Sequence, residues 1–169
     1  MTITLEQART IVDGALAHGT EAGFNPLTAA VLDPGGALVA LARQDGSGNL
    51  RPDIAVAKAW GVLGLGMTNR AIAARAADSP EFFTSVATLA GGRILSVPGG
   101  VFIRDGDGRL LGAVGVTGDA SLNDEAAALA GIAAAGLVGV TGAEYVRGCA
   151  GAAAARAATR RRRAPPRRS

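Results

Sequence analysis

Two ionisable side chains of this sequence have the character needed for acid–base chemistry. Lys58 lies in the apolar stretch "DIAVAKAWGVL", beside the small residues Ala57 and Gly61 of the expected helix. An ammonium group in such a confined place needs a partner, and Asp45 or Asp124 could supply it. With a lowered pKa, Lys58 could act as a base, and Lys58 or Asp124 would then be the catalytic residue. The alternative is a lysine stem that lies along the helix with its charge in water.

A second pair of side chains has the chemistry for binding an acid group. Arg43 and Asp45 are expected at the end of a strand, beside a Gly-Ser-Gly loop. A guanidinium group binds a carboxylate through two parallel hydrogen bonds, so the pair could orient an anionic ligand. The alternative is an exposed ion pair that contributes little to stability.

Glycine is concentrated in "SVPGGVFIRDGDGRLLGAVGVTGDASLNDE", residues 96–125, which holds seven glycines. Glycines have no side chain to cover the backbone, so the N–H groups at the start of the last helix could donate hydrogen bonds to a carboxylate or a propionate. The alternative is that these glycines form turns and let a helix pack closely, while a polar side chain already caps the helix. The binding hypothesis assigns the ligand to Gly99, Gly100 and Gly118.

The elements that must position these residues follow from hydrophobic periodicity and turn signals. Two hairpins are expected, the first with a type II turn that has Pro34 and Gly35 at its centre. Consecutive strands are joined by short turns and not by helices, so hairpins are expected and βαβ units are not. The sequence therefore predicts an α+β fold in which a central antiparallel sheet of four to five strands is flanked by helices. The order is α-β-β-α-α-β-β-α, with helices at 4–23, 52–66, 68–78 and 121–139, and strands at 27–32, 37–45, 94–104 and 109–117.

Length and charge indicate one domain with a basic tail. The chain has 169 residues, of which 49% are hydrophobic, enough for one well-packed core. Residues 1–155 hold ten Lys and Arg against fourteen Asp and Glu, whereas residues 156–169 hold seven Arg. We therefore expect a domain over 1–149 and a disordered Ala/Arg-rich tail over 150–169, and a nucleic-acid partner is not favoured.

Three further sequence features indicate where in the cell the protein is expected. The chain contains one cysteine, Cys149, which excludes an internal disulfide. The N-terminus lacks the pattern of an export signal, and no apolar run is long enough for a membrane span. These observations predict a cytoplasmic protein with no membrane partner.

Four stretches together resemble a known family. They are "DPGGALVALARQDG" (33–46), "DIAVAKAWGVL" followed by "TNRAIA" (53–73), "VPGGVFIRDGDGRLLGAVGVTG" (97–118) and "NDEAAALAGI" (123–132). In this order and spacing they resemble the GlcG/HbpS-like proteins, also called the haem-degrading domain family, which includes the C-terminal domain of PduO-type proteins. The resemblance implies a compact α+β domain, assembly as a homo-oligomer of up to eight copies, and haem as a possible cofactor.

This chain also differs from the family pattern. The export signal of secreted haem-binding members is absent, and Phe102 replaces the usual proline after "PGGV", which changes the shape beside the glycine pair. Apart from Met1, the usual donors to haem iron are His18, Met67, Tyr145 and Cys149. We therefore expect that any haem is held by weak oxygen ligation, for which Thr117 is the candidate, or by arginines at its propionates.

These observations favour a small-ligand-binding protein with a pocket where the "VPGG" turn, the end of the "GVTGD" strand and the helix of Lys58 meet. Its ligand is expected to carry acid groups, with haem as the best precedent. The alternative is a cofactor-independent enzyme that acts on a small oxo- or hydroxy-acid. Lys58 or Asp124 would move a proton, while Arg43 and the glycine amides hold the carboxylate. A third possibility is a purely structural subunit of an assembly. In that case side chains should fill the pocket, and replacing Lys58 should have no effect on the function of the protein.

Overall fold

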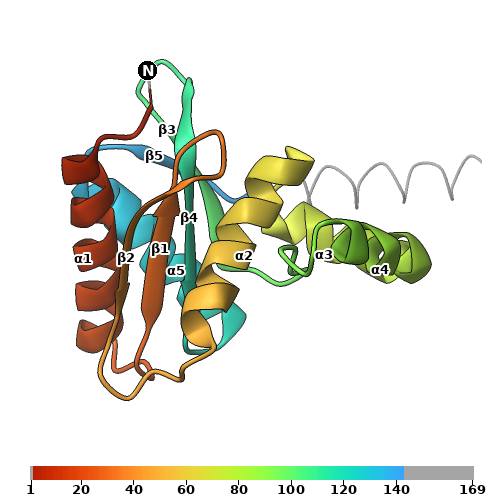
Figure 1. Ribbon diagram of the computed structural model, residues 1–169. Coiled ribbons are helices and arrows are strands. Elements are labelled where there is room, and N and C mark those ends of the chain that lie inside the picture. Colours follow the sequence, from red (N-terminus) through yellow and green to blue (C-terminus); the bar gives the residue numbers. More distant parts are fainter. Residues whose placement is uncertain (1, 143–169) are drawn as a thin grey trace, which may run out of the picture.

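The fold is a five-stranded antiparallel sheet with helices against both faces (Figure 1). The computed structural model describes residues 2–142, so Tyr145, Cys149 and the expected tail over 150–169 lie outside the described range. Its elements are α1 (Leu5–Glu21), β1 (Thr28–Leu32), β2 (Leu38–Arg43), α2 (Arg51–Leu65), α3 (Asn69–Asp78), α4 (Pro80–Leu89), β3 (Gly100–Arg104), β4 (Leu110–Thr117), α5 (Ser121–Ala134) and β5 (Val138–Val140). The predicted α+β class, antiparallel sheet and element order are confirmed.

The strand order in the sheet is β2-β1-β4-β3-β5, and every neighbouring pair is antiparallel. The predicted hairpins β1–β2 and β3–β4 are joined through β1 and β4, which places β2 at one edge. Thr28 of β1 pairs with Arg43 of β2 on one side and with Thr117 of β4 on the other. Directly paired residues share a face, so these three side chains form one row at one end of the sheet.

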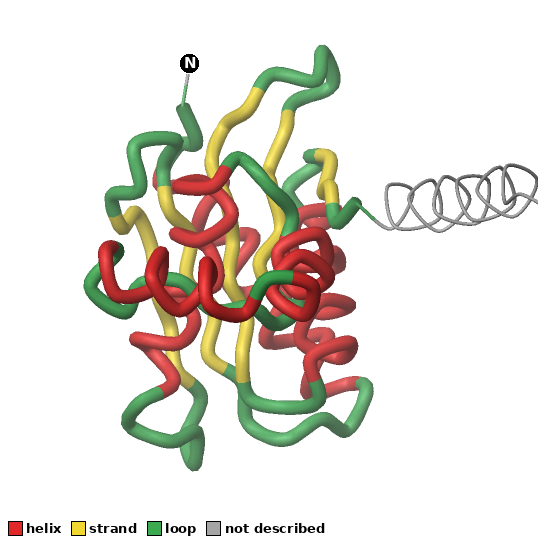
Figure 2. The backbone as a smooth tube through the Cα atoms, turned by 90° about the vertical axis from the view of Figure 1, so that its right-hand side faces the viewer, coloured by secondary structure: helices red, strands yellow, loops and turns green. Residues whose placement is uncertain are grey.

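Two hydrophobic clusters cover the two faces of the sheet. The larger one joins α1 and α5 to the sheet through residues such as Ile11, Val114 and Ile132. The smaller one joins α2 to the opposite face, where Val62 packs near Phe102. Figure 2 looks onto the sheet from the side of α3 and α4. Both faces of the central strands are thus buried, which explains their almost continuous apolar sequence.

The first hairpin turn differs from the prediction. The positive φ of +83° belongs to Gly36 and not to Gly35, so the predicted type II turn is wrong. Gly36 N donates to Asp33 O at 2.9 Å, and the Asp33 carboxylate accepts from Ala37 N at 2.9 Å. This is the pattern of a turn followed by one left-handed residue, which the side-chain hydrogen bond of Asp33 stabilises.

The structure also adds elements that the sequence did not separate. The helix expected to reach Gly139 ends at Ala134, and the strand β5 follows it. The strand expected from residue 94 begins at Gly100, because Asn69 Nδ2 instead holds the preceding segment through Leu95 O and Val97 O, at 3.3 and 2.6 Å.

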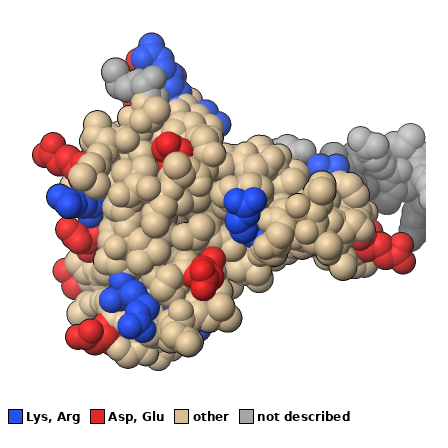
Figure 3. Space-filling view, in the orientation of Figure 1, with Lys and Arg blue, Asp and Glu red and all other residues tan. Residues whose placement is uncertain are grey.

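Helix α4 projects from the body together with α3 (Figure 1). Its apolar side chains Phe82 and Leu89 are 61% and 89% exposed. Charged side chains are sparse and scattered on the face shown in Figure 3. None of the helices within residues 2–142 is long and apolar enough to cross a membrane.

Candidate functional site

A buried ion pair connects α2 to the first turn of α5. Lys58 Nζ lies 2.8 Å from Asp124 Oδ2 and also donates to Val116 O at 2.9 Å. The two residues are only 2% and 1% exposed, so the lysine does not extend into water. Of the two partners that the sequence left open, the structure selects Asp124, whereas Asp45 is exposed beyond β2.

Burial and charge act in opposite directions on this pair. Burial is the largest effect on Lys58 and lowers its pKa, and the charge and hydrogen bond of Asp124 partly offset it. Burial likewise raises the pKa of Asp124, against the charge and hydrogen bond of Lys58. Arg51 lies close enough to lower both pKa values. Each group is therefore stable in its charged form only through the other.

The glycine pair before β3 packs directly against this ion pair. A Cβ at Gly99, whose φ is +117°, would lie 2.6 Å from Lys58 Nζ and 2.7 Å from Val116 O. A Cβ at Gly100 would collide with Asn69 Oδ1 and with Lys58 O, and one at Gly118 would come within 2.8 Å of Leu27 Cα. The space in front of these glycines is filled by α2, by the start of α3 and by residues 26 and 27, which precede β1. This is what the close-packing alternative predicts.

The start of α5 is occupied by the chain's own carboxylates. Asp119 accepts hydrogen bonds from Asn25 N, Ala120 N and Asn123 Nδ2, each at 2.7 Å. Asp124 Oδ1 accepts from Asp119 N at 3.0 Å. Two negative charges already satisfy this helix end, which disfavours the approach of a further anion.

Asp119 is expected to make stability depend on pH in the acid range. The backbone hydrogen bond from Asn25 is the largest cause that lowers the pKa of Asp119 from 3.8 to about 2. A depressed folded-state pKa stabilises the fold above pH 3.8, and this contribution is lost as the pH falls towards 2. In urea unfolding between pH 2 and 5, Asp119→Asn should therefore flatten the pH dependence. Asp107→Asn, on the β3–β4 turn, is the control, and equal slopes for wild type and Asp119→Asn would contradict the assignment.

A second polar cluster lies at the end of the sheet on the α2 side. Arg51 Nη1 donates to Thr117 Oγ1 at 2.7 Å, and Thr28 Oγ1 shares a hydrogen bond of 2.9 Å with Ser47 Oγ. Arg43 Nη1 donates to Ser47 O. Each guanidinium makes one hydrogen bond to the residues that the structure describes, so the other N–H donors of the five have no partner among those residues. We call these five residues the arginine–threonine row.

Not every predicted residue joins this row. Arg43 and Thr117 belong to it, but Asp45 is exposed and forms no ion pair with any residue of 2–142. Lys58, Asp124 and Gly99 form a separate, buried cluster beside Val116, the neighbour of Thr117 in β4. Gly100 packs against the backbone of Lys58, and Gly118 packs against Leu27. The structure thus divides the predicted site into a buried ion pair and a row in which only the two arginines, Arg43 and Arg51, are exposed or half-buried.

Three contributions were missed by the sequence reasoning. Arg51 begins α2, where the helix dipole disfavours a cation, and this unfavourable placement was a usable signal for another contact. Arg70 Nε lies 3.0 Å from both carboxylate oxygens of Glu125, which is 5% exposed. Asn69 is 1% exposed, and its Oδ1 has no hydrogen-bond partner among the described atoms. No spacing in the sequence indicated the latter two.

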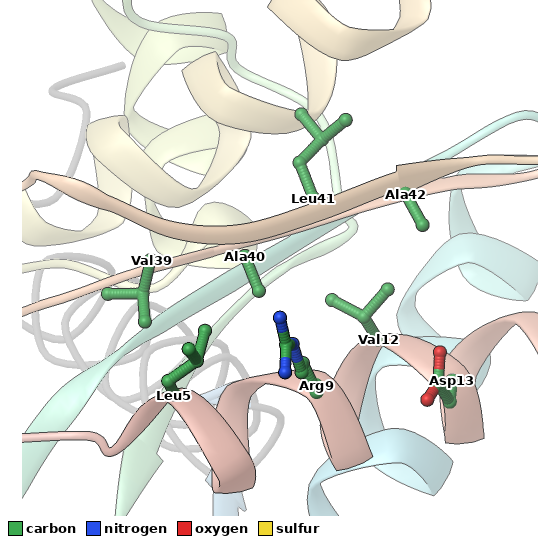
Figure 4. A pocket seen from close by; sticks show the side chains of 8 residues that line it. All are labelled: Leu5, Arg9, Val12, Asp13, Val39, Ala40, Leu41 and Ala42. Carbon is green, nitrogen blue, oxygen red and sulfur yellow. The ribbon is translucent and has the colours of Figure 1, made fainter.

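A hollow of about 480 Å³ lies between α1 and β2 (Figure 4). It is on the opposite face of the sheet from α2, and therefore away from Lys58. Its walls are Leu5, Arg9, Val12, Asp13, Val39, Ala40, Leu41 and Ala42.

The sheet order β2-β1-β4-β3-β5, with α1 and α5 on one face and α2 on the other, defines a small α+β domain whose fold is shared with solved structures. A family model described as haem degrading protein HbpS-like matches residues 3–133. The chain belongs to the HbpS-like family, so the resemblance drawn from the sequence is confirmed.

Solved structures share the fold of this chain. HbpS of Streptomyces reticuli, in a double-mutant form, is 26% identical with a TM-score of 0.67, over 79% of this chain and 86% of that one. Klebsiella pneumoniae protein ORFY is 24% identical with a TM-score of 0.73, over 80% and 92%. A complex of PduOC with heme is 17% identical with a TM-score of 0.70, over 82% and 98%, and shows a shared fold. A comparison with curated protein sequences gave no match.

Proposed function

We propose that this protein binds a small ligand that carries acid groups, and that the ligand lies at the arginine–threonine row. The observation that carries the proposal is that Arg43 contacts Ser47 and Arg51 contacts Thr117, each through one of its five N–H donors, while the others have no partner within residues 2–142. A guanidinium with free N–H groups suits a carboxylate, which accepts two parallel hydrogen bonds. Arg43 is exposed and Arg51 is half-buried, whereas Thr28, Ser47 and Thr117 are at most 5% exposed, so a ligand from solvent would meet the two arginine side chains.

In this proposal, the buried cluster of Lys58, Asp124 and Gly99 positions the residues that bind the ligand. Lys58 and Asp124 tie α2 and α5 to Val116, the residue before Thr117. Gly99, Gly100 and Gly118 allow the close approach that makes these contacts possible. The ion pair therefore holds the hydroxyl of Thr117 and the guanidinium of Arg51 in place, and it has no direct contact with the ligand.

Haem fits this row through its acid groups only. The family description and the PduOC complex make haem the natural precedent, and the two propionates match the two guanidinium groups. Thr117, the oxygen ligand expected from the sequence, is 1% exposed and its Oγ1 accepts from Arg51, so it is not presented to an iron atom. The ring of His18 packs edge-on against Phe24 with 5.9 Å between ring centroids, and Met67 Sδ accepts from Arg75 at 3.6 Å. Within residues 2–142, no group of three His, Cys, Asp or Glu side chains is placed to hold a metal ion. We therefore assign the affinity to the carboxylates and not to the iron.

A titration with haemin and with iron-free protoporphyrin IX tests this assignment. We expect the two Kd values to agree within a few-fold, because both compounds carry the same propionates. Arg43→Ala and Arg51→Ala should each weaken binding by roughly 10-fold, which corresponds to one charge-assisted hydrogen bond. Arg109→Ala, on the distant β3–β4 turn, is the matched control. Tight haemin binding that protoporphyrin IX does not share, or that neither row variant weakens, would overturn the proposal.

Proton transfer to a small oxo- or hydroxy-acid is the second candidate function. It is supported by the opposed pKa shifts of Lys58 and Asp124, a common arrangement in acid–base sites. We favour binding because both groups are engaged with each other and nearly fully buried. Lys58→Met combined with Asp124→Leu keeps side chains of similar volume between α2 and α5, so it should weaken ligand affinity at most a few-fold. A catalytic pair would instead lose all turnover of the acid while the protein stays folded.

A further inference from the structure

The hollow between α1 and β2 has mainly apolar walls. Figure 4 shows Val39, Ala40 and Ala42 pointing from the strand towards the helix, from which Val12 points back towards them. Ala40 and Ala42 each carry only a methyl group, so room remains between the strand and the helix. The volume of about 480 Å³ lies within the range of about 300–1,000 Å³ that is usual for small-molecule sites. The walls therefore suit a small ligand with a short apolar part.

Two side chains of opposite charge border this hollow on α1. Arg9 and Asp13 are one helical turn apart, and both are exposed. In Figure 4, Arg9 points from the helix towards Ala40, and Asp13 lies further along the helix, beyond Val12. Neither of them forms an ion pair with another residue of 2–142. A positive and a negative group thus lie at the same opening, where a ligand can contact both.

The order of these two residues along the helix disfavours a direct ion pair. An acid four residues before a base pairs better on a helix than the reverse order, which is the order found here. A simple carboxylate at this opening is attracted by Arg9 and repelled by Asp13, and a simple amine experiences the opposite. A molecule with both groups satisfies both residues, because a guanidinium binds a carboxylate through two hydrogen bonds while the Asp13 carboxylate accepts from an ammonium.

We propose that the hollow binds a free amino acid with a branched aliphatic side chain, such as leucine. The α-carboxylate lies against the guanidinium of Arg9, and the α-ammonium lies against the carboxylate of Asp13. The side chain of the ligand fills the space beside Ala40 and Ala42. The described residues that line the hollow include no aromatic ring, so nothing there favours an aromatic ligand by stacking.

This amino-acid site is separate from the arginine–threonine row. Ala42 and Arg43 are consecutive in β2, and successive side chains of a strand point to opposite faces of the sheet. Ala42 lines the hollow on the α1 side, whereas Arg43 contacts Ser47 on the other side. The two sites share no residue, so this inference goes beyond the function proposed above and is tested separately from it.

A ligand-observed NMR titration of the purified full chain with leucine and three analogues tests each contact. The compound 4-methylpentanoate lacks the ammonium, 3-methylbutylamine lacks the carboxylate, and glycine lacks the aliphatic side chain. We expect leucine to bind saturably. Each analogue should bind roughly 10-fold or more weakly, because it loses one charge-assisted contact or the apolar contact.

Variants of the hollow test the same contacts from the side of the protein. Arg9→Ala and Asp13→Ala should each weaken leucine binding by roughly 10-fold. Ala42→Leu places a larger side chain in the hollow while both charges remain, and it should abolish binding. Arg109→Ala, on the distant β3–β4 turn, is the control and should leave leucine affinity unchanged. Arg9 and Asp13 are exposed, so their variants should fold, which far-ultraviolet circular dichroism checks.

Three results would each overturn the amino-acid site. They are the absence of saturable leucine binding, an affinity for glycine or 4-methylpentanoate equal to that for leucine, and leucine binding that neither Arg9→Ala nor Asp13→Ala weakens. None of them bears on the arginine–threonine row, because the porphyrin titration that tests the row depends on Arg43 and Arg51.

Discussion

Replacing Asp124 by alanine is expected to lower the free energy of unfolding by about 3–5 kcal/mol. Lys58 would keep its buried position, 2% exposed, with Val116 O as its remaining hydrogen-bond partner among the described residues. An unpaired ammonium group in such a place must lose its proton or draw in water, and either costs free energy. Urea unfolding monitored by circular dichroism measures the difference between variant and wild type.

Two further variants make this result specific. Asp45→Ala removes the other carboxylate that the sequence offered to Lys58, and because Asp45 is exposed we expect a change within about 0.5 kcal/mol. Lys58→Met combined with Asp124→Leu removes both charges at similar volume and should restore most of the stability. A loss for Asp124→Ala no larger than that for Asp45→Ala would show that the ion pair does not stabilise the fold.

Replacing Gly115 by alanine is expected to cost about 3 kcal/mol, at the upper end for overpacking of a core. Gly115 lies in β4 beneath α2, where an added Cβ would collide with Ala55 O and lie 2.9 Å from Ala59 N. These are helix backbone atoms, so relief requires that the whole of α2 move away from the sheet. The same denaturant titration measures the cost.

Gly106→Ala is the matched control, because a Cβ there would meet no atom within 4 Å. We expect it to be nearly neutral. The comparison decides between the two interpretations of the glycine-rich stretch. If Gly115→Ala were as harmless as Gly106→Ala, the backbone of β4 would have free space in front of it, and a ligand in that space would again be the better explanation.

Local signals in the sequence were sufficient for most of the fold. Thr4 and Gln7, three residues apart, form a capping box at the start of α1, with hydrogen bonds of 3.1 and 3.2 Å. The turns at 33–36 and 105–108 lie where predicted, and alternating or continuous apolar runs identified the four longer strands. These features depend on residues within a few positions of each other, so the order of residues alone specifies them.

Element boundaries depended on contacts from elsewhere in the chain. Strand β5 has three residues, and it exists as a strand through its pairing with β3. Segment 94–99 has a β-like sequence, but Asn69 holds it outside the sheet. The split between α3 and α4 at Ser79 follows from Pro80, a signal that indicated a break without showing that a second helix begins there.

Residue types and local patterns were enough to identify the side chains that could bind an acid group or transfer a proton, and the helices and strands that carry them. Lys58, Asp124, Arg43 and Thr117 were all identified from their types and their places on helices and strands. Only the tertiary structure decided their partners, since Lys58 and Asp124, like Arg51 and Thr117, are 66 residues apart along the chain. Hydrophobic packing of α2 against β4 sets these distances. The interaction energy of a buried ion pair changes strongly when its separation changes by about an ångström, and no local sequence pattern specifies a distance between residues so far apart in the chain.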